Sequence, residues 1–526
     1  MRAWLLRHGW LLAIAAAYLY VFPYFPKIQS ANELPRVYLV KAMAEEGTFA
    51  IDRGVARWGG TADVSPWRGH QYSNKAPGSS MLVVPVYIAF RIAVRAADGE
   101  PSLAATMWLC RVLSGVLPML LFLRLLDGFL RRWAPADPAR RLVLVGYALG
   151  SMAMTYSILY ISHQLAAVCV GAAWILALDF ADGRRPLRAM AAAGFLAGAS
   201  VLVEYQAAFA LPVLAAHVIW RLRRARLPRR ELARALAVAA AAAVIPIAVL
   251  LAYHQACFDS PLRTGYDASE TFAGYHQQGF LGITELRWEA FHGSTFSPDN
   301  GLFTLSPWWL LAFPGAALLW RRRERERDIV LACGSIAVIY VLFISSINFW
   351  RGGWSVGPRY ITVMLPFLLP FVATSVEAAA TVEAAAATGK RRTLLLGAAA
   401  GTIAIGVIIY TAAAATFPHW PDRYRSPLYE VTFRLLADGL VAPSLGSWLG
   451  LGGIASALPY FALVAGLLGW SIVRAGGWRT LAVAAAVAIA VIGSYSWLPR
   501  TPDGEAPYQG VVRPAVAAGT TAGPAR

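Results

Sequence analysis

Residues 32–52 read NELPRVYLVKAMAEEGTFAID, and residues 70–80 read HQYSNKAPGSS. These two pieces bound a polar stretch, from Asn32 to Ser79, that is set between hydrophobic segments. Acids, bases, amides and turn residues crowd together in it, at one edge of an otherwise apolar chain. The apolar runs around this stretch decide the fold class, and the stretch itself holds the first candidates for chemistry.

The composition is that of a membrane protein. Hydrophobic residues make up 58% of the 526 residues, charged residues make up 14%, and the mean hydropathy is +0.52. Most of the chain is therefore too apolar for the surface of a water-soluble domain. Backbone amides in lipid must be hydrogen-bonded internally, so these long apolar runs predict helices rather than barrel strands. We expect an all-α polytopic membrane protein with about thirteen transmembrane helices of roughly 20 residues each.

The net charge of +18 comes from 47 lysines and arginines against 29 acids. The arginines fall in short clusters between apolar runs, which is the positive-inside pattern rather than a nucleic-acid-binding surface. The segment 80–94 decides the topology. If it crosses, the arginine-rich loop 131–141 lies outside; if it dips in or lies flat, that loop and every later arginine cluster are cytoplasmic. The second arrangement is more economical, and it places the N-terminus inside and the C-terminus outside.

The expected organisation is one helical membrane domain over residues 1–499 and a Pro/Gly/Ala-rich disordered tail over residues 500–526. The first extracytoplasmic loop, residues 27–103, would hold a helix lying on the membrane surface and a dipping helix. Residues 256–304 and 417–456 form further outer loops. The cytoplasmic loops are short and basic while the outer loops are long and chemically mixed, so we expect function on the outer face.

Three carboxylates of the first outer loop, Glu33, Asp52 and Asp63, are candidates for chemistry. Ser30 and Glu33 also fit a helix capping box, and the two aspartates also fit solvated surface charges. The outer acids, with Asp299, could bind a divalent cation, but their spacing matches no metal motif, and no cofactor is predicted. The absence of nucleophile-elbow, Walker and zinc motifs argues against triad hydrolases, nucleotide motors and zinc enzymes.

Lys75 and Arg359 are candidate phosphate ligands. Lys75 lies in YSNKAPGSS, where Pro and Gly fix a turn at the membrane edge. Arg359 follows Gly and Pro in WSVGPRY and opens a span, with Arg351 nearby; arginine can grip phosphate through two parallel hydrogen bonds. The alternative for both is interfacial anchoring. His163 and Glu204 lie at outer span ends, where an ionisable group suggests function.

Several pieces of the chain together resemble the GT-C membrane glycosyltransferases, in the branch with the lipid A aminoarabinose transferases and the protein O-mannosyltransferases. They are Asn32-Glu33, LPRVYLVKAMAEEGTFAID, YSNKAP (72–77), FSPDNGLFTLSP (296–307) and GGWSVGPRY (352–360). Asn32 stands where the family usually has Asp, and Lys75-Ala76-Pro77 replaces Lys-Pro-Pro. The role of base would therefore fall to Glu33, the first choice, or move to Asp52 or Asp63.

The resemblance implies a GT-C fold and an inverting sugar transfer from a polyprenyl-phosphate donor to a hydroxyl of a glycan, lipid or protein, on the outer face of the bacterial inner membrane. A loop carboxylate would deprotonate the acceptor, and Lys75, Arg359 and Arg351 would stabilise the leaving phosphate. The expected cavity residues are Asn32, Tyr72, Asn74, His163, Glu204, Tyr205, Trp354 and Tyr360. The alternatives are a transporter or flippase of lipid-linked saccharides and a lipid-linked glycan ligase or polymerase.

Overall fold

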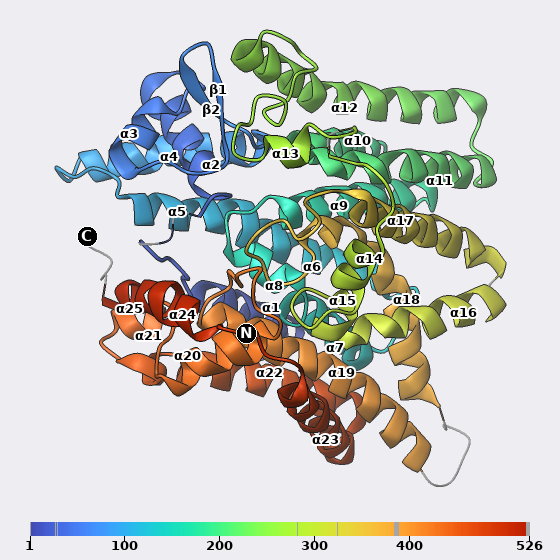
Figure 1. Ribbon diagram of the computed structural model, residues 1–526. Coiled ribbons are helices and arrows are strands. Elements are labelled where there is room, and N and C mark those ends of the chain that lie inside the picture. Colours follow the sequence, from blue (N-terminus) through green and yellow to red (C-terminus); the bar gives the residue numbers. More distant parts are fainter. Residues whose placement is uncertain are drawn as a thin grey trace.

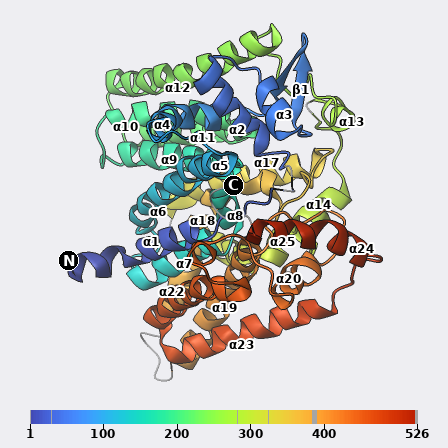
Figure 2. The same ribbon diagram turned by 90° about the vertical axis from the view of Figure 1, so that its left-hand side faces the viewer.

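The computed structural model describes residues 2–26, 28, 30–280, 282–322, 324–382 and 389–521. The described chain is almost entirely helical, which confirms the predicted all-α class (Figure 1). Its one sheet is a two-stranded antiparallel hairpin, β1 (Val64–Trp67) and β2 (His70–Ser73). This hairpin lies beside α3 (Asp52–Trp58) in both views (Figures 1 and 2).

The helices follow one another along the chain. In the first half they are α1 (Arg2–Tyr20), α2 (Leu34–Lys41), α3, α4 (Gly78–Arg95), α5 (Leu103–Arg111), α6 (Leu117–Leu130), α7 (Asp137–Leu149), α8 (Met152–Ile158), α9 (His163–Ala181), α10 (Arg188–Val203), α11 (Leu211–Arg224) and α12 (Arg229–Phe258). In the second half they are α13 (Ala273–His276), α14 (Trp288–Thr295), α15 (Leu302–Leu305), α16 (Ala312–Arg322), α17 (Arg327–Ser346), α18 (Leu365–Thr381), α19 (Lys390–Ala415), α20 (Phe433–Ala437), α21 (Leu445–Trp448), α22 (Leu458–Gly476), α23 (Trp478–Ser494), α24 (Glu505–Pro507) and α25 (Arg513–Thr521).

Eight helical stretches of the described chain are long and apolar enough to cross a membrane, which confirms the membrane class. They are Gly78–Arg95, Leu103–Leu130, His163–Ala181, Arg229–Phe258, Arg327–Ser346, Arg359–Thr381, Lys390–Ala415 and Leu458–Trp497. The count of about thirteen is not confirmed. One expected span, residues 142–160, is interrupted between α7 and α8, where the Ser151 side chain accepts a hydrogen bond from the Ala153 N–H and so starts a new helix.

The helix expected on the membrane surface is present as α2, but all eight of its residues are buried in the protein. Val37, Tyr38 and Val40 pack in one apolar cluster with Val83 and Tyr87 of α4. α2 is therefore a packed element and not an exposed amphipathic helix, because side chains from more than one neighbouring segment cover it. This packing fixes the position of the polar residues that precede it.

The C-terminal segment differs from the disorder that its composition predicts. α24 and α25 lie beside α20 in both views (Figures 1 and 2). Tyr508, Val512 and Val516 recur every four residues and are buried in the main core, and the Tyr508 hydroxyl donates to Asp438 Oδ2 at 2.6 Å. This apolar face stabilises helices despite the content of Pro, Gly and Ala. Residues 522–526 lie outside the described chain.

Candidate active site

A cavity of about 680 Å³ lies where several of the connecting segments meet. Its lining includes Ile28, Ser30, Ala31, Asn32, Asp63 and Lys75 from the first loop, Tyr266, Phe272, Tyr275 and His276 from the segment after α12, Phe349, Gly352, Gly353, Trp354, Arg359 and Tyr360 from the segment after α17, and Ile161, His419 and Asp422. Six of the site residues predicted from the sequence line this one cavity: Asn32, Asp63, Lys75, Trp354, Arg359 and Tyr360.

The helix α4 covers the segment 80–94, which the sequence predicts to dip into the membrane or lie flat on it. α4 is long and apolar enough to cross a membrane, so its course stays a prediction.

The β1–β2 hairpin brings Asp63 and Lys75 together. Val64 pairs with Ser73, so Asp63 and Asn74 face each other just beyond the paired ends of the strands. The Asn74 N–H donates to the Asp63 carbonyl at 3.3 Å, and the Asn74 side-chain amide donates to Asp63 Oδ1 at 3.2 Å. Lys75 Nζ lies 3.0 Å from the same Oδ1. Among the described residues, Oδ2 of Asp63 has no hydrogen bond.

The cavity lining contains two buried cations, Lys75 and Arg359, and two carboxylates, the buried Asp63 and the exposed Asp422. Burial lowers the pKa of Lys75, the guanidinium groups of Arg36 and Arg359 lower it further, and Asp63 opposes them. Arg359 is buried, and its Nε has no hydrogen-bond partner in the described chain. A buried guanidinium with an unpaired N–H is typical of an anion-binding site.

Glycine allows Arg359 to reach this position. A Cβ on Gly352 would come within 2.7 Å of Arg359 Nε, and Gly352 has a φ of +70°, a conformation that other residues rarely adopt. Gly353 follows with a φ of +79°. The two glycines of GGWSVGPRY therefore form the turn that leaves room for the guanidinium beside Trp354 and Tyr360.

Asn32 lies at the cavity surface, with a buried polar network behind it. Arg36 donates to the Asn32 carbonyl at 2.5 Å and also to its side-chain oxygen. Arg36 also donates to Ser162 Oγ at 2.7 Å, and Ser162 in turn donates to Glu204 at 2.7 Å. His163 contacts Gln206 at 2.8 Å, and its ring meets that of Tyr360 edge to face. Glu204 and His163 thus support the cavity from behind rather than line it.

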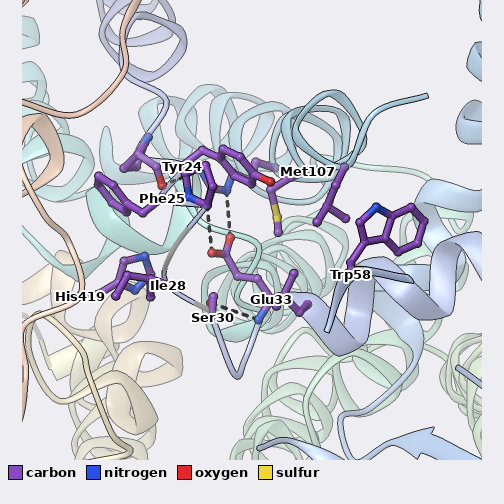
Figure 3. A pocket seen from close by; sticks show the side chains of 13 residues that line it. Tyr24, Phe25, Ile28, Ser30, Glu33, Trp58, Met107 and His419 are labelled. Atoms are coloured by element: carbon purple, nitrogen blue, oxygen red, sulfur yellow. Dashed lines mark hydrogen bonds and ion pairs between the residues drawn. The ribbon is translucent and has the colours of Figure 1, made fainter. Parts of the chain in front are cut away.

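Glu33, the first choice for a base, lies in a separate pocket of about 70 Å³. Figure 3 shows its carboxylate held by two interactions, with His419 and Ile28 on the far side of the pocket. Arg111 donates to both carboxylate oxygens at 2.9 Å, and the Tyr160 N–H donates to Oε1 at 2.6 Å. Burial alone would raise the pKa of Glu33, but Arg111 and Tyr160 outweigh burial and hold it below the ordinary value.

The capping box expected at Ser30 and Glu33 is only half formed. The Glu33 N–H donates to Ser30 Oγ at 3.4 Å (Figure 3), but the Glu33 carboxylate turns to Arg111 instead of returning to the backbone. A bidentate pair with an arginine is stronger than a cap hydrogen bond, so the carboxylate binds Arg111 rather than the backbone N–H at the start of the helix. A catalytic role for Glu33 remains a prediction. The ion pair with Arg111 gives Glu33 a structural role as well.

The other expected site residues lie outside the cavity lining. Asp52 begins α3, accepts a hydrogen bond from the Gln71 N–H at 3.0 Å and has a side chain that is 44% exposed. Tyr72 packs edge to face on Phe258. The others contact polar partners elsewhere: Asn74 contacts Asp63, Tyr205 contacts His254, and Arg351 forms an ion pair with Asp299.

Sequence reasoning missed the aromatic wall of the cavity. The Tyr266 and His276 rings lie 4.5 Å apart, and Phe349 packs against Phe272 and Tyr275 at 5.2 Å and 4.9 Å. The only local signal is the run TFAGYHQQGF at residues 271–280. Burial lowers the pKa of His276 and of His419 to about 4 each, so both rings are neutral at neutral pH. The wall therefore adds apolar surface and no charge.

The outer acids that could have shared a cation do not gather. Within the described part of the chain, no group of three His, Cys, Asp or Glu side chains could hold a metal ion. Asp63 is paired with Lys75, Glu33 with Arg111 and Asp299 with Arg351. Each of these carboxylates is thus neutralised by a separate cationic side chain.

No protein-family model matches the chain, and no curated protein matches it. The solved structures that are similar to the chain include two of ArnT from Cupriavidus metallidurans. The structure bound to undecaprenyl phosphate has 14% identity and a TM-score of 0.44, over 93% of this chain and 78% of ArnT. The apo structure has 15% identity and a TM-score of 0.47, over 94% and 77%. At these values the likeness to ArnT says nothing about the reaction. The evidence for function is the set of residues that line the cavity.

Proposed function

We propose that the protein is a membrane glycosyltransferase that takes its sugar from a polyprenyl-phosphate donor. One observation carries the proposal: Lys75 and Arg359, two buried cations from distant parts of the sequence, line the same cavity as the carboxylate of Asp63. Two buried cations beside a buried carboxylate suit a reaction in which a phosphate leaves and a hydroxyl loses its proton, and Asp422, the other acid of the lining, is exposed. The apolar helices around the cavity suit a donor that stays in the membrane.

The cations suit the leaving group. A polyprenyl-phosphate sugar is a phosphodiester with one negative charge, and the polyprenyl phosphate that departs is a monoester that can carry two. Lys75 and Arg359 therefore interact more strongly with the leaving phosphate than with the bound donor. Interactions that strengthen toward the transition state accelerate a reaction, whereas uniform binding does not.

Asp63 is the proposed base. Its Oδ1 is held by Lys75 and Asn74, and Oδ2 remains for the acceptor hydroxyl. The acceptor oxygen forms a bond to the anomeric carbon as the bond from that carbon to the phosphate oxygen breaks, and the hydroxyl proton passes to Asp63. Glu33 is engaged on both oxygens and Asp52 lies outside the cavity lining, so both are weaker candidates.

Aromatic side chains of the cavity supply the sugar subsite. Trp354, Tyr266 and Tyr360 line the cavity next to the charged residues. Their faces can pack on the apolar side of a sugar ring, while the tyrosine hydroxyls offer hydrogen bonds. The donor phosphate would sit between Lys75 and Arg359, with the sugar against these aromatic side chains.

The test uses the full chain in lipid nanodiscs with labelled undecaprenyl-phosphate hexoses and pentoses, and an envelope extract as the source of acceptors. We expect new glycosidic product and release of undecaprenyl phosphate, both lost in Asp63→Asn and in Arg359→Gln. Arg423→Gln is the control, because Arg423 is exposed and outside the cavity lining. Undiminished transfer in Asp63→Asn and Arg359→Gln would refute the proposal.

Two other outcomes would replace it. If the protein, placed instead in sealed lipid vesicles, moved labelled lipid across the membrane without a new glycosidic bond, it would be a flippase. If only diphosphate-linked donors reacted, it would be a ligase or polymerase of lipid-linked glycans.

A further inference from the structure

A second hollow of about 520 Å³ lies away from the cavity, between the second half of α6 and the end of α9. It is lined by Leu121, Arg124, Leu125, Asp127, Gly128, Phe129, Arg131, Asp179, Arg184 and Arg185. Ile161, just before α9, lines the cavity, while Asp179 near its C-terminal end lines this groove. A helix of 19 residues is about 28 Å long, so the two hollows lie at opposite ends of α9.

The groove is rich in positive charge. Arg124, Arg131, Arg184 and Arg185 line it, against two aspartates. Arg185 pairs with Asp179 at 3.0 Å, but Arg184 lies 3.9 Å from the same carboxylate, which Arg132 also shares. Arg131 lies 3.6 Å from Asp127. Arg124 is exposed and has no ion pair or hydrogen bond among the residues that the structure describes. The arginines therefore exceed the acids that could neutralise them.

An exposed apolar stripe on α6 continues into this arginine-rich groove. Leu117 and Leu121 are 46% and 65% exposed, and with Leu125 and Gly128 they follow helical spacing along one face of α6. A Cβ on Gly128 would meet nothing within 4 Å, so the groove is open there. Leucines of this kind are what the lipid-facing side of a membrane helix presents.

We propose that this groove binds the headgroup of an anionic phospholipid. The phosphate would lie among Arg124, Arg131 and Arg184, and an acyl chain would run along Leu121 and Leu117. Charge complementarity and the continuity of the apolar stripe with the basic groove favour this occupant, because a free phosphate or a soluble acidic peptide would not use the leucines. Basic pockets between membrane helices hold anionic headgroups in this manner. The proposal is independent of the sugar-transfer reaction.

The test is native mass spectrometry of the full chain, equilibrated with equal amounts of phosphatidylglycerol and phosphatidylcholine. We expect the wild type to retain phosphatidylglycerol preferentially, and the double variant Arg124→Gln/Arg131→Gln to lose about fivefold in affinity for each arginine removed. The control is Arg229→Gln/Arg230→Gln, which removes two exposed arginines from the start of α12 and should leave the preference unchanged.

A second groove variant, Arg184→Gln/Arg185→Gln, removes two arginines that the loop after α9 contributes to the same groove. It replaces the first variant in the test if the first does not fold. The proposal fails if the wild type shows no preference between the two lipids. It also fails if a folded groove variant keeps the preference, or if the control variant loses as much as the groove variants.

Discussion

The ammonium nitrogen of Lys75 lies 3.0 Å from Oδ1 of Asp63, and both side chains are buried. This pair places a cation and a carboxylate at adjacent points of the cavity wall, with Arg359 in the same lining. A transfer reaction needs a cation for its leaving phosphate and a carboxylate for its incoming hydroxyl. The hairpin between them keeps the two groups at a fixed separation.

Removal of either cation should weaken binding of undecaprenyl phosphate. We expect Lys75→Ala and Arg359→Gln each to weaken it about 10- to 100-fold, the usual value of a hydrogen bond to a charged group. Ligand-induced thermal stabilisation of the purified protein measures the effect without knowledge of the sugar. Arg423→Gln should bind as the wild type does, and wild-type binding by both cavity variants would contradict the assignment.

Binding of undecaprenyl phosphate should also fall at alkaline pH. Burial and the nearby arginines lower the pKa of Lys75 from its ordinary value of 10.5, so Lys75 loses its charge at a lower pH than an exposed lysine does. The affinity should therefore decline as the pH rises toward that ordinary value. Lys75→Arg keeps its charge over this range, and an unchanged alkaline decline in that variant would exclude Lys75 as the titrating group.

Asp63→Asn should abolish transfer while donor binding remains. A general base contributes about 10²- to 10⁴-fold to a rate, and asparagine keeps the size of the side chain but cannot accept the proton. Undecaprenyl phosphate should bind Asp63→Asn at least as tightly, because Lys75 loses a competing anion. Asp52→Asn is the matched comparison and should stay near wild-type activity, since Asp52 lies outside the lining. The opposite pattern would move the base to Asp52.

Glu33 should matter for stability first. Breaking a buried ion pair by removing one partner costs about 3–5 kcal/mol, so we expect Glu33→Gln and Arg111→Met each to lower the unfolding temperature. The double variant should recover part of the loss, because it leaves no unpaired charge. Thermal unfolding in detergent measures this. A Glu33→Gln protein of wild-type stability that had lost transfer would instead make Glu33 catalytic.

The Glu33 pair also predicts a pH dependence of stability. The pKa of Glu33 in the folded protein lies below the ordinary value of 4.5, so folding favours the charged form. The stability it contributes is complete above pH 4.5 and is lost as the pH falls through the lower folded pKa. The difference in unfolding temperature between wild type and Glu33→Gln should therefore be constant near neutrality and shrink in acid. A difference that grew in acid would have the wrong sign.

The sequence by itself determined the membrane class, because hydropathy is a local property of the chain, while the outer-face location of the candidate chemistry stays a prediction from charge clustering. It also named Asp63, Lys75, Trp354 and Arg359, since polar residues in turns next to apolar runs stand out without knowledge of the fold. The sequence did not predict the helices of the C-terminal segment, because its Pro, Gly and Ala content indicated disorder more strongly than its short apolar periodicity indicated a helix. The aromatic wall left only a weak local signal.

Only the tertiary structure decided which carboxylate faces the cavity. Glu33 and Asp63 are both acids of the same loop, and nothing in their immediate neighbours separates them. Glu33 forms an ion pair with Arg111, a residue of α5, and lies in a separate pocket. Asp63 lines the cavity because the register of the β1–β2 hairpin places it there. The charge on a buried acid is set by the partner that packing brings to it, and such a partner can lie far along the chain.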